Sequence, residues 1–182
     1  MRFATLGPEG SNHALVLRRY LERRGPADAR VELFEAFPEA FEALLAGRVD
    51  RVLQCTAHPS HADCVGSTMH RAFPVEAFVA GSRPLALLAR AEVAVPVSVG
   101  LQPATRHYTD LSAFDEHHDY ATIVEVAAAL RRGEVDAGIC AREVLAQHPD
   151  DLRLVRDLGS ALDVWVLYAT QPLSEEHPLV LA

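Results

Sequence analysis

The first 55 residues alternate between two hydrophobic periodicities, and this alternation constrains the fold more than any other feature of the chain. Short apolar runs at Arg2–Leu6, Val31–Phe34 and Val49–Cys55 have the length of strands. Between Phe37 and Leu45, apolar residues recur with the spacing of an amphipathic helix. Because parallel neighbours need long crossovers, a strand–helix–strand–helix–strand order implies a mostly parallel sheet with covering helices. We therefore expect an α/β fold.

Capping residues set the ends of the helices in this region. Ser11 or Asn12 can cap a helix that runs to about Arg24, where Gly25-Pro26 ends it. Gly47 follows the second helix as its C-cap. The His-, Ser- and Asp-rich segment from Thr56 to Arg71 is predicted to be a loop.

The remainder of the chain again mixes strands and helices. Strands are expected at Phe73–Ala80, Pro84–Ala89, Val95–Gly100, Val135–Cys140, Leu152–Val155 and Val164–Ala169. Helices are expected from Pro103, from Thr122 to Arg132 with Gly133 after it, and at Ala141–Gln147. No sequence repeat is present, but the two halves of the chain share this architecture.

Two similar α/β lobes predict a two-lobed periplasmic-binding-protein-like (type II) fold. Its sheets would be mixed, with helices on both faces and a ligand cleft between the lobes. Lobe 1 is expected to comprise residues 1–79 plus 160–182, and lobe 2 residues 80–159. The chain would cross between them near Val79–Arg83 and Arg156–Ala161.

Composition excludes several functions. The formal net charge of -8 argues against a nucleic-acid partner. Every basic side chain is Arg, so Schiff-base chemistry on lysine is excluded. The chain has neither a secretory leader nor an apolar run of about 20 residues, so we expect a cytoplasmic protein without a membrane partner. The cysteines (Cys55, Cys64, Cys140) are expected to be reduced thiols.

The segment Gly7-Pro8-Glu9-Gly10-Ser11 has the properties of an anion-binding corner. Its glycines allow a sharp turn, and the helix that follows presents free N–H groups and a partial positive charge. We expect Gly10, Ser11 and Asn12 to bind a carboxylate of a small substrate. An ordinary strand-to-helix turn with a capping Ser is the structural alternative.

This segment, with Thr5 and Leu6 before it, resembles the opening of prephenate dehydratases. The resemblance continues at Pro103-Ala104-Thr105, where the family has a Ser-x-Pro-Gln turn, and at Thr122, where it has a Ser-Thr-Ala helix start. It implies that substrate contacts from the second lobe come from Thr105, Arg106, His107 and Thr122. Thr56, after the third strand, would contribute from the first lobe.

The departures from the dehydratase pattern point to a different reaction. The chain has Cys55-Thr56-Ala57-His58-Pro59 where dehydratases have Pro-Ile-Glu-Asn-Ser, and Asp163-Val164-Trp165 where they have Thr-Arg-Phe. The regulatory domain of many dehydratases is not expected here. The pattern is most similar to the stand-alone prephenate decarboxylases of the bacilysin-pathway type, which serve specialised amino-acid and antibiotic biosynthesis.

That resemblance implies decarboxylation of prephenate without aromatisation, giving a dihydro-4-hydroxyphenylpyruvate and needing no cofactor. An ionised Asp163 only accepts hydrogen bonds and cannot protonate the leaving hydroxyl as a Thr could. His13 is the leading candidate for the acid at the ring carbon, although a helix N-terminus would lower its pKa. His58 and His107 are alternatives, and Arg106 could pair with a carboxylate.

Other functions remain open. They are a divergent prephenate dehydratase forming phenylpyruvate, a non-catalytic small-acid-binding protein of the same fold, and a lyase or isomerase acting on another cyclohexadienyl acid. A homodimer is possible. Cys55, His58, His61 and Cys64 recur at every third residue, but this is not a known zinc spacing, so we expect no metal site.

Overall fold

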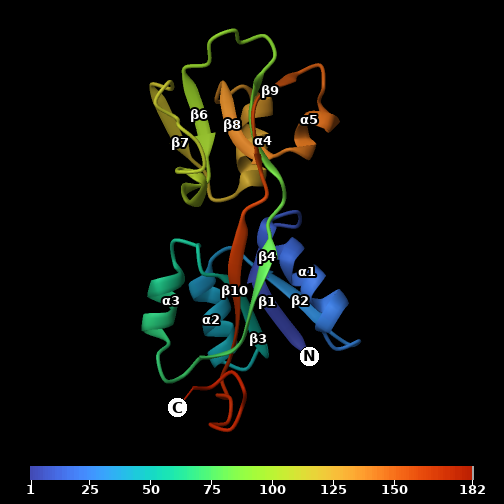
Figure 1. The fold of residues 1–182 in the computed structure, drawn as a ribbon, viewed down its shortest axis with the longest axis vertical. Helices are drawn as coiled ribbons and strands as arrows, with labels where there is room; N and C mark the ends of the chain where they lie inside the picture. The colour runs from blue at the N-terminus through green and yellow to red at the C-terminus, as the bar shows by residue number, and fades with distance from the viewer. Residues whose placement is uncertain (182) are drawn as a thin grey trace. The chain divides into compact units, whose positions relative to one another are not determined.

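The computed structural model describes residues 1–181, which divide into two compact units. Unit 1 comprises Met1–Ser82 with Leu162–Ala182, and unit 2 comprises Arg83–Ala161. Each unit contains its own five-stranded sheet, so the described chain is a two-lobed α/β protein (Figure 1). The α/β fold class expected from the alternating periodicity is confirmed.

The sheet of unit 1 has the strand order β2-β1-β3-β10-β4. β1 is parallel to β2 and β3, whereas β10 is antiparallel to both β3 and β4. Figure 1 shows β4 and β10 running side by side as the two long strands of this sheet. The elements of unit 1 are β1 Arg2–Leu6, α1 Asn12–Arg24, β2 Arg30–Phe34, α2 Phe37–Leu45, β3 Arg51–Cys55, α3 His61–Ser67, β4 Phe73–Gly81 and β10 Leu162–Ala169.

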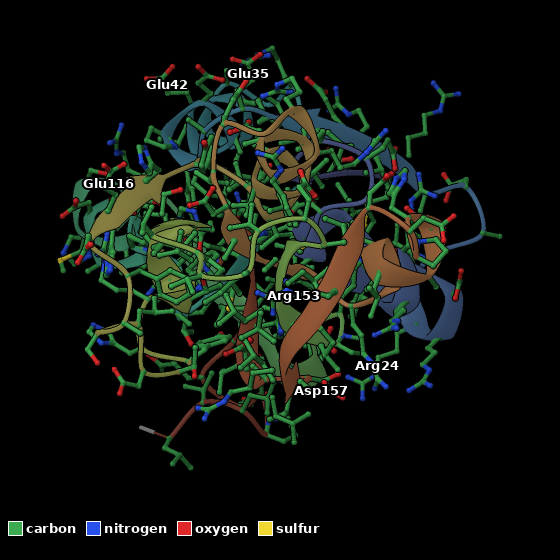
Figure 2. All side chains as sticks on the ribbon, turned by 90° about the horizontal axis from the view of Figure 1, so that it is seen from above. Arg24, Glu35, Glu42, Glu116, Arg153 and Asp157 are labelled. Carbon is green, nitrogen blue, oxygen red and sulfur yellow. The ribbon has the colours of Figure 1, made fainter. Side chains whose placement is uncertain are left out.

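Helices α1 and α2 bury their apolar stripes against opposite faces of this sheet. Leu17 of α1 packs in one cluster with Leu53 and Trp165, whereas Phe37 and Phe41 of α2 belong to another cluster. Burying each such large side chain is worth roughly 1.5–3 kcal/mol. The outer surface here is polar, and Figure 2 shows the side chains of Glu35 and Glu42 pointing outward.

The segment after β3 was expected to be a loop throughout, and this is wrong. Residues His61–Ser67 form helix α3, which is anchored by the buried Cys64. The Thr68 hydroxyl donates to the carbonyl oxygen of Cys64 (2.7 Å) and satisfies the end of the helix. With one apolar anchor on seven residues, the helix leaves no amphipathic period to detect.

The sheet of unit 2 has the order β7-β6-β8-β5-β9. β5 is antiparallel to β8 and β9, whereas β6 is parallel to β7 and β8. The elements are β5 Leu85–Arg90, β6 Ser98–Leu101, the 3-10 turn η1 Pro103–Thr105, β7 Glu116–Asp119, α4 Ile123–Arg132, β8 Ala137–Ala141, α5 Glu143–Gln147 and β9 Leu152–Gly159.

Two expectations in unit 2 are corrected. Pro103 opens only the single turn η1, capped by the Gln102 side chain at the Ala104 amide, and not a helix, because no apolar stripe follows. Residues Glu116–Asp119, where no strand was expected, form the edge strand β7 with every side chain exposed. By contrast, the cap of α4 at Thr122 and its end at the left-handed Gly133 (φ 73°) are confirmed.

No helix within residues 1–181 is both long and apolar enough to cross a bilayer.

Candidate functional site

In unit 1, polar and aromatic side chains gather where β1 and β3 end and β10 begins. The parallel strands β1 and β3 lead into loops at this edge, and the antiparallel β10 pairs with β3 there, with Trp165 opposite Cys55. Ligands of open α/β sheets bind outside the carboxyl ends of the strands. The candidate site therefore lies in unit 1, around these loops.

The corner between β1 and α1 is held by hydrogen bonds to Ser11. Its N–H donates to the carbonyl oxygen of Pro8 (3.0 Å), and Gly10 takes the left-handed conformation that the turn needs (φ 86°). The Ser11 hydroxyl donates to Leu6 O (3.0 Å) and accepts from the Ala14 amide (3.1 Å). Ser11 is therefore the N-cap, as predicted, and its buried hydroxyl is committed to the corner.

The start of α1 retains donor capacity for an anion. The His13 amide, in the first turn, makes no hydrogen bond within residues 1–181. Amides of a first helical turn carry a partial positive charge and have no intrahelical acceptor. The donor capacity of this corner thus lies in the backbone rather than in the Ser11 hydroxyl.

Four rings meet directly beside this helix start. The His13 ring lies 5.2 Å from Phe37, 5.1 Å from Trp165 and 5.5 Å from His58, all centroid to centroid and edge-on. Phe37 and His58 are also in edge contact, at 4.9 Å. We call His13, Phe37, His58 and Trp165 the ring cluster. It brings together two of the catalytic candidates from the sequence.

The His13 imidazole is kept neutral by its surroundings. Part of the residue reaches the surface, but its Nε2 atom is buried and has no hydrogen-bond partner among the described residues. Burial, followed by the proximity of His58, lowers the pKa of His13 to about 3. The sequence suggested the helix N-terminus as the cause of a lowered pKa, whereas loss of solvation dominates. A neutral His13 at physiological pH is not a standing proton donor.

His58 is oriented by Ser60. The Ser60 amide donates to His58 Nδ1 (3.2 Å), and the Ser60 hydroxyl lies 2.8 Å from the same nitrogen. Burial, with a smaller effect of His61, lowers the pKa of His58 below its ordinary value. Sequence reasoning missed Ser60, and the only signal was a Ser two residues after a His.

Asp163 occupies the start of β10 beside the end of β3. It is half-buried, and burial raises the pKa of its carboxyl group above the ordinary range. Burial also raises the pKa of the Cys55 thiol to about 11, with a further contribution from Asp163. The Thr56 amide and hydroxyl both approach Val164 O, at 3.0 and 3.2 Å. Burial at this edge thus disfavours the charged forms of both Asp163 and Cys55.

Three of the candidate residues from unit 2 make hydrogen bonds to partners in the same unit. The buried Thr105 donates its hydroxyl to Gln102 O (2.8 Å), and Arg106 contacts both carboxylate oxygens of Asp119 at 2.7 and 2.9 Å. Thr122 accepts from the Glu125 amide as the cap of α4. His107 is exposed. Their proposed roles in substrate binding remain predictions.

The cysteine and histidine side chains after β3 make protein contacts. His61 Nε2 lies 2.9 Å from the Tyr168 hydroxyl, and Cys64 Sγ donates to the Ser60 hydroxyl at 3.9 Å. No group of three or more His, Cys, Asp or Glu side chains within residues 1–181 is arranged to hold a metal ion.

The architecture defines the class: a type II periplasmic-binding-protein-like fold, with two mixed sheets and covering helices. Prephenate dehydratase from Arthrobacter aurescens, solved in complex with L-Phe, superposes with a TM-score of 0.65 at 19% identity over 97% of this chain. The chain spans 63% of that enzyme's length.

Solute-binding proteins are similar to a lesser degree. The periplasmic aliphatic sulphonate binding protein SsuA from Escherichia coli matches with a TM-score of 0.51 at 16% identity, over 93% of this chain and 64% of its own. The arginine-bound form of truncated ArgBP from T. maritima matches at 0.50 and 15% identity, over 94% of this chain and 88% of its own. These identities establish the fold alone.

No protein-family model matches the chain, and no curated protein matches it in sequence.

Proposed function

We propose that this chain is a cofactor-independent lyase that decarboxylates prephenate and leaves the ring hydroxyl in place. The substrate class is supported by the resemblance of the Gly7–Ser11 corner to the opening of prephenate dehydratases and by the likeness in fold to one of them. The product would be a dihydro-4-hydroxyphenylpyruvate for specialised amino-acid or antibiotic biosynthesis.

The half-buried Asp163 is the observation on which the proposal depends. It stands where the resemblance places the Thr of dehydratases, and burial raises the pKa of its carboxyl group. From the sequence, Asp163 was expected to be ionised and only to accept hydrogen bonds. A raised pKa favours the protonated carboxyl group, which could act as a general acid.

The reaction needs one proton and no cofactor. The bond between the quaternary ring carbon and its carboxylate breaks, and its electron pair forms a new ring double bond. The adjacent double bond shifts and takes a proton at a ring carbon. In our proposal Asp163 supplies that proton and becomes a carboxylate, while CO2 departs and the hydroxyl stays in place.

The ring cluster is consistent with Asp163, rather than a histidine, acting as the acid. His13, with its pKa lowered to about 3, is neutral throughout the physiological range, so the acid assignment moves from His13 to Asp163. The pyruvyl carboxylate of the substrate is assigned to the α1 start, where the partial charge of the helix favours an anion.

Product identification tests the proposal. Purified protein is incubated with prephenate, and the product is examined by NMR and by ultraviolet absorbance in alkali. The expected product keeps the C4 hydroxyl and lacks an aromatic ring. Asp163→Asn, which keeps the size but removes the proton, should lower turnover at least about a hundredfold. Asp157→Asn, at an exposed carboxylate of unit 2, is the matched control and should retain turnover. Wild-type turnover in Asp163→Asn would contradict the role of Asp163.

A divergent prephenate dehydratase is the second candidate, and the raised pKa of the Asp163 carboxyl group supports it too. If the same proton were delivered to the C4 hydroxyl, water and CO2 would leave together and phenylpyruvate would form. Phenylpyruvate absorbs strongly as its enolate in alkali, so the assay above separates the two reactions.

A non-catalytic small-acid-binding protein is the third candidate. The similarity to solute-binding proteins supports it, and so does the absence of charged imidazoles from the ring cluster. Stabilisation of the protein by prephenate in a thermal-shift assay, with no product formed, would favour binding over catalysis.

A further inference from the structure

His58 has a defined protonation state, because one of its ring nitrogens already accepts hydrogen bonds. A backbone N–H can only donate, so the 3.2 Å contact from the Ser60 amide requires Nδ1 of His58 to lack a proton. The Ser60 hydroxyl, at 2.8 Å from the same nitrogen, then donates as well. In the neutral ring the proton must lie on Nε2.

The contact between Cys64 and Ser60 supports the same direction for the Ser60–His58 hydrogen bond. The Cys64 thiol donates to the Ser60 hydroxyl oxygen at 3.9 Å, which leaves the hydroxyl proton for His58. Protonating Nδ1 would break both hydrogen bonds from Ser60. This loss acts together with burial and the nearby His61, which lower the pKa of His58.

The ring cluster contains no full positive charge. The sequence has no lysine, and no arginine within residues 1–181 makes a ring contact or hydrogen bond with His13, Phe37, His58 or Trp165. His13 beside His58 has a pKa of about 3. An anion beside these rings would meet apolar edges and an uncharged donor.

We infer that Ser60 holds His58 as the neutral Nε2–H tautomer, and that this N–H binds the departing carboxylate of the substrate. The inference rests on the proposed function and adds to it a subsite: the ring carboxylate at the ring cluster, beside the pyruvyl carboxylate at the α1 start. His58 touches the substrate, whereas Ser60 is a positioning residue.

An uncharged donor favours loss of CO2 more than a cation would. The negative charge of the carboxylate moves into the ring as the carbon–carbon bond breaks, and the CO2 that leaves is neutral. A cation at this place would stabilise the ground state more than the transition state. A neutral N–H orients the departing carboxylate with less stabilisation of the ground state. His58 neither gains nor loses a proton, because Asp163 protonates the ring carbon.

Nitrogen-15 NMR of the histidine side chains is the direct test. Between about pH 6 and 8, His58 should show an unprotonated, hydrogen-bonded Nδ1 and a protonated Nε2, assigned by loss of its signals in His58→Gln. Addition of prephenate should move the Nε2 resonance and leave Nδ1 nearly unchanged. A proton on Nδ1, an imidazolium ring, or an Nε2 resonance that does not respond to bound prephenate would overturn the inference.

Two substitutions of His58 distinguish the roles of its two ring nitrogens in turnover. Gln places an N–H near the position of Nε2, and Asn places one near Nδ1. His58→Gln should keep turnover within about tenfold, whereas His58→Asn should lose about a hundredfold or more. Equal losses in the two variants would contradict the inference.

Matched variants control for folding and for position. His70→Asn makes the same change at an exposed residue with a φ of 63°, which Asn adopts readily, and should not affect turnover. Ser60→Ala should lower turnover and shift the Nδ1 resonance of His58, and a purely structural role would leave that resonance in place.

Failure of the proposed activity can be distinguished from failure of the inference about His58. If prephenate binds without loss of CO2, or does not bind, the proposed activity is wrong. The spectrum of the free protein still decides the tautomer of His58.

Discussion

At the scale of single residues, the charge state of Asp163 has a consequence for stability that needs no substrate. Its pKa is raised in the folded protein, so the folded state binds more protons than the unfolded chain. The associated stability is present below the unfolded pKa and is lost as pH rises through the folded pKa. Asp163→Asn should therefore raise the melting temperature at pH 7, and the gain should vanish below about pH 4. Thermal melts across this range measure it.

Asp50 is a control carboxylate whose pKa shift has the opposite sign to that of Asp163. Hydrogen bonds from the Arg2 amide (2.6 Å) and guanidinium lower the pKa of its carboxyl group. The stability from this pair is present above the unfolded pKa and is lost as pH falls through the folded pKa. Asp50→Asn should be destabilised at pH 7. A gain for Asp163→Asn that does not vary with pH would rule out ionisation as its cause.

His13 makes a second prediction, because its buried Nε2 lacks a partner. His13→Phe keeps a ring against Phe37 and Trp165 and removes the unpaired atom, which should stabilise the protein by about 1 kcal/mol at pH 7. Since the folded pKa is about 3, the unfolded chain takes up a proton first as pH falls below the ordinary 6.5. The gain should therefore grow on acidification, as urea denaturation at pH 7 and pH 5 would show. A gain that shrinks would contradict a neutral, buried imidazole.

At the scale of elements, the start of α1 depends on Ser11 for two hydrogen bonds at once. Ser11→Ala removes the cap of the Ala14 amide and the bond to Leu6 O, both in a buried setting. We expect a loss of about 1–2 kcal/mol in the free energy of unfolding. Thr122→Ala removes a cap of the same kind at the more accessible start of α4 and should cost less. Denaturation curves compare them, and an equal or smaller loss at Ser11 would contradict its structural role.

Elements with strong hydrophobic periodicity were predictable from the sequence, and weakly patterned ones were not. Of the stripe that its spacing predicted, helix α2 buries Phe37, Ala40, Phe41 and Leu44, and Leu45 is partly buried. β7 is an exposed edge strand without apolar side chains, so nothing in its sequence distinguishes it from a loop. The strand exists because its backbone pairs with β6, a tertiary contact that no local pattern encodes.

The proximity of the candidate residues was predictable from the sequence, but the effect of burial on their pKa values was not. Sequence reasoning selected His13, His58 and Asp163, which lie at one edge of unit 1. It assigned the acid role to His13 and expected an ionised Asp163, whereas burial lowers the pKa of His13 and raises the pKa of the Asp163 carboxyl group. Burial comes from tertiary packing, which a one-dimensional pattern does not give. Ser60 acts through the tautomer of His58, and its only sequence signal is its place two residues after that histidine.

At the scale of the whole molecule, each unit has its own hydrophobic cores, and none of these clusters contains residues of both units. The clusters around Phe41 and around Trp165 contain only residues of unit 1, whereas the clusters around Ile139 and Leu130 contain only residues of unit 2. A unit that contains its own core and its own sheet has what it needs to fold alone. Unit 2 is thus an insertion between β4 and β10 of unit 1.

The register of β4 and β10 makes this independence testable. Gly81 lies directly opposite Leu162 in an antiparallel pair, so a two-residue Asn-Gly turn in place of Ser82–Ala161 would close a β-hairpin. The shortened chain should unfold cooperatively. Its single Trp, Trp165, should keep the blue-shifted fluorescence of a ring that is 1% exposed. A Pro-Pro turn at the same junction is the control, since it cannot adopt the hairpin geometry and should lower the melting temperature. Red-shifted emission from the Asn-Gly chain would mean that unit 1 needs the inserted unit to hold its core.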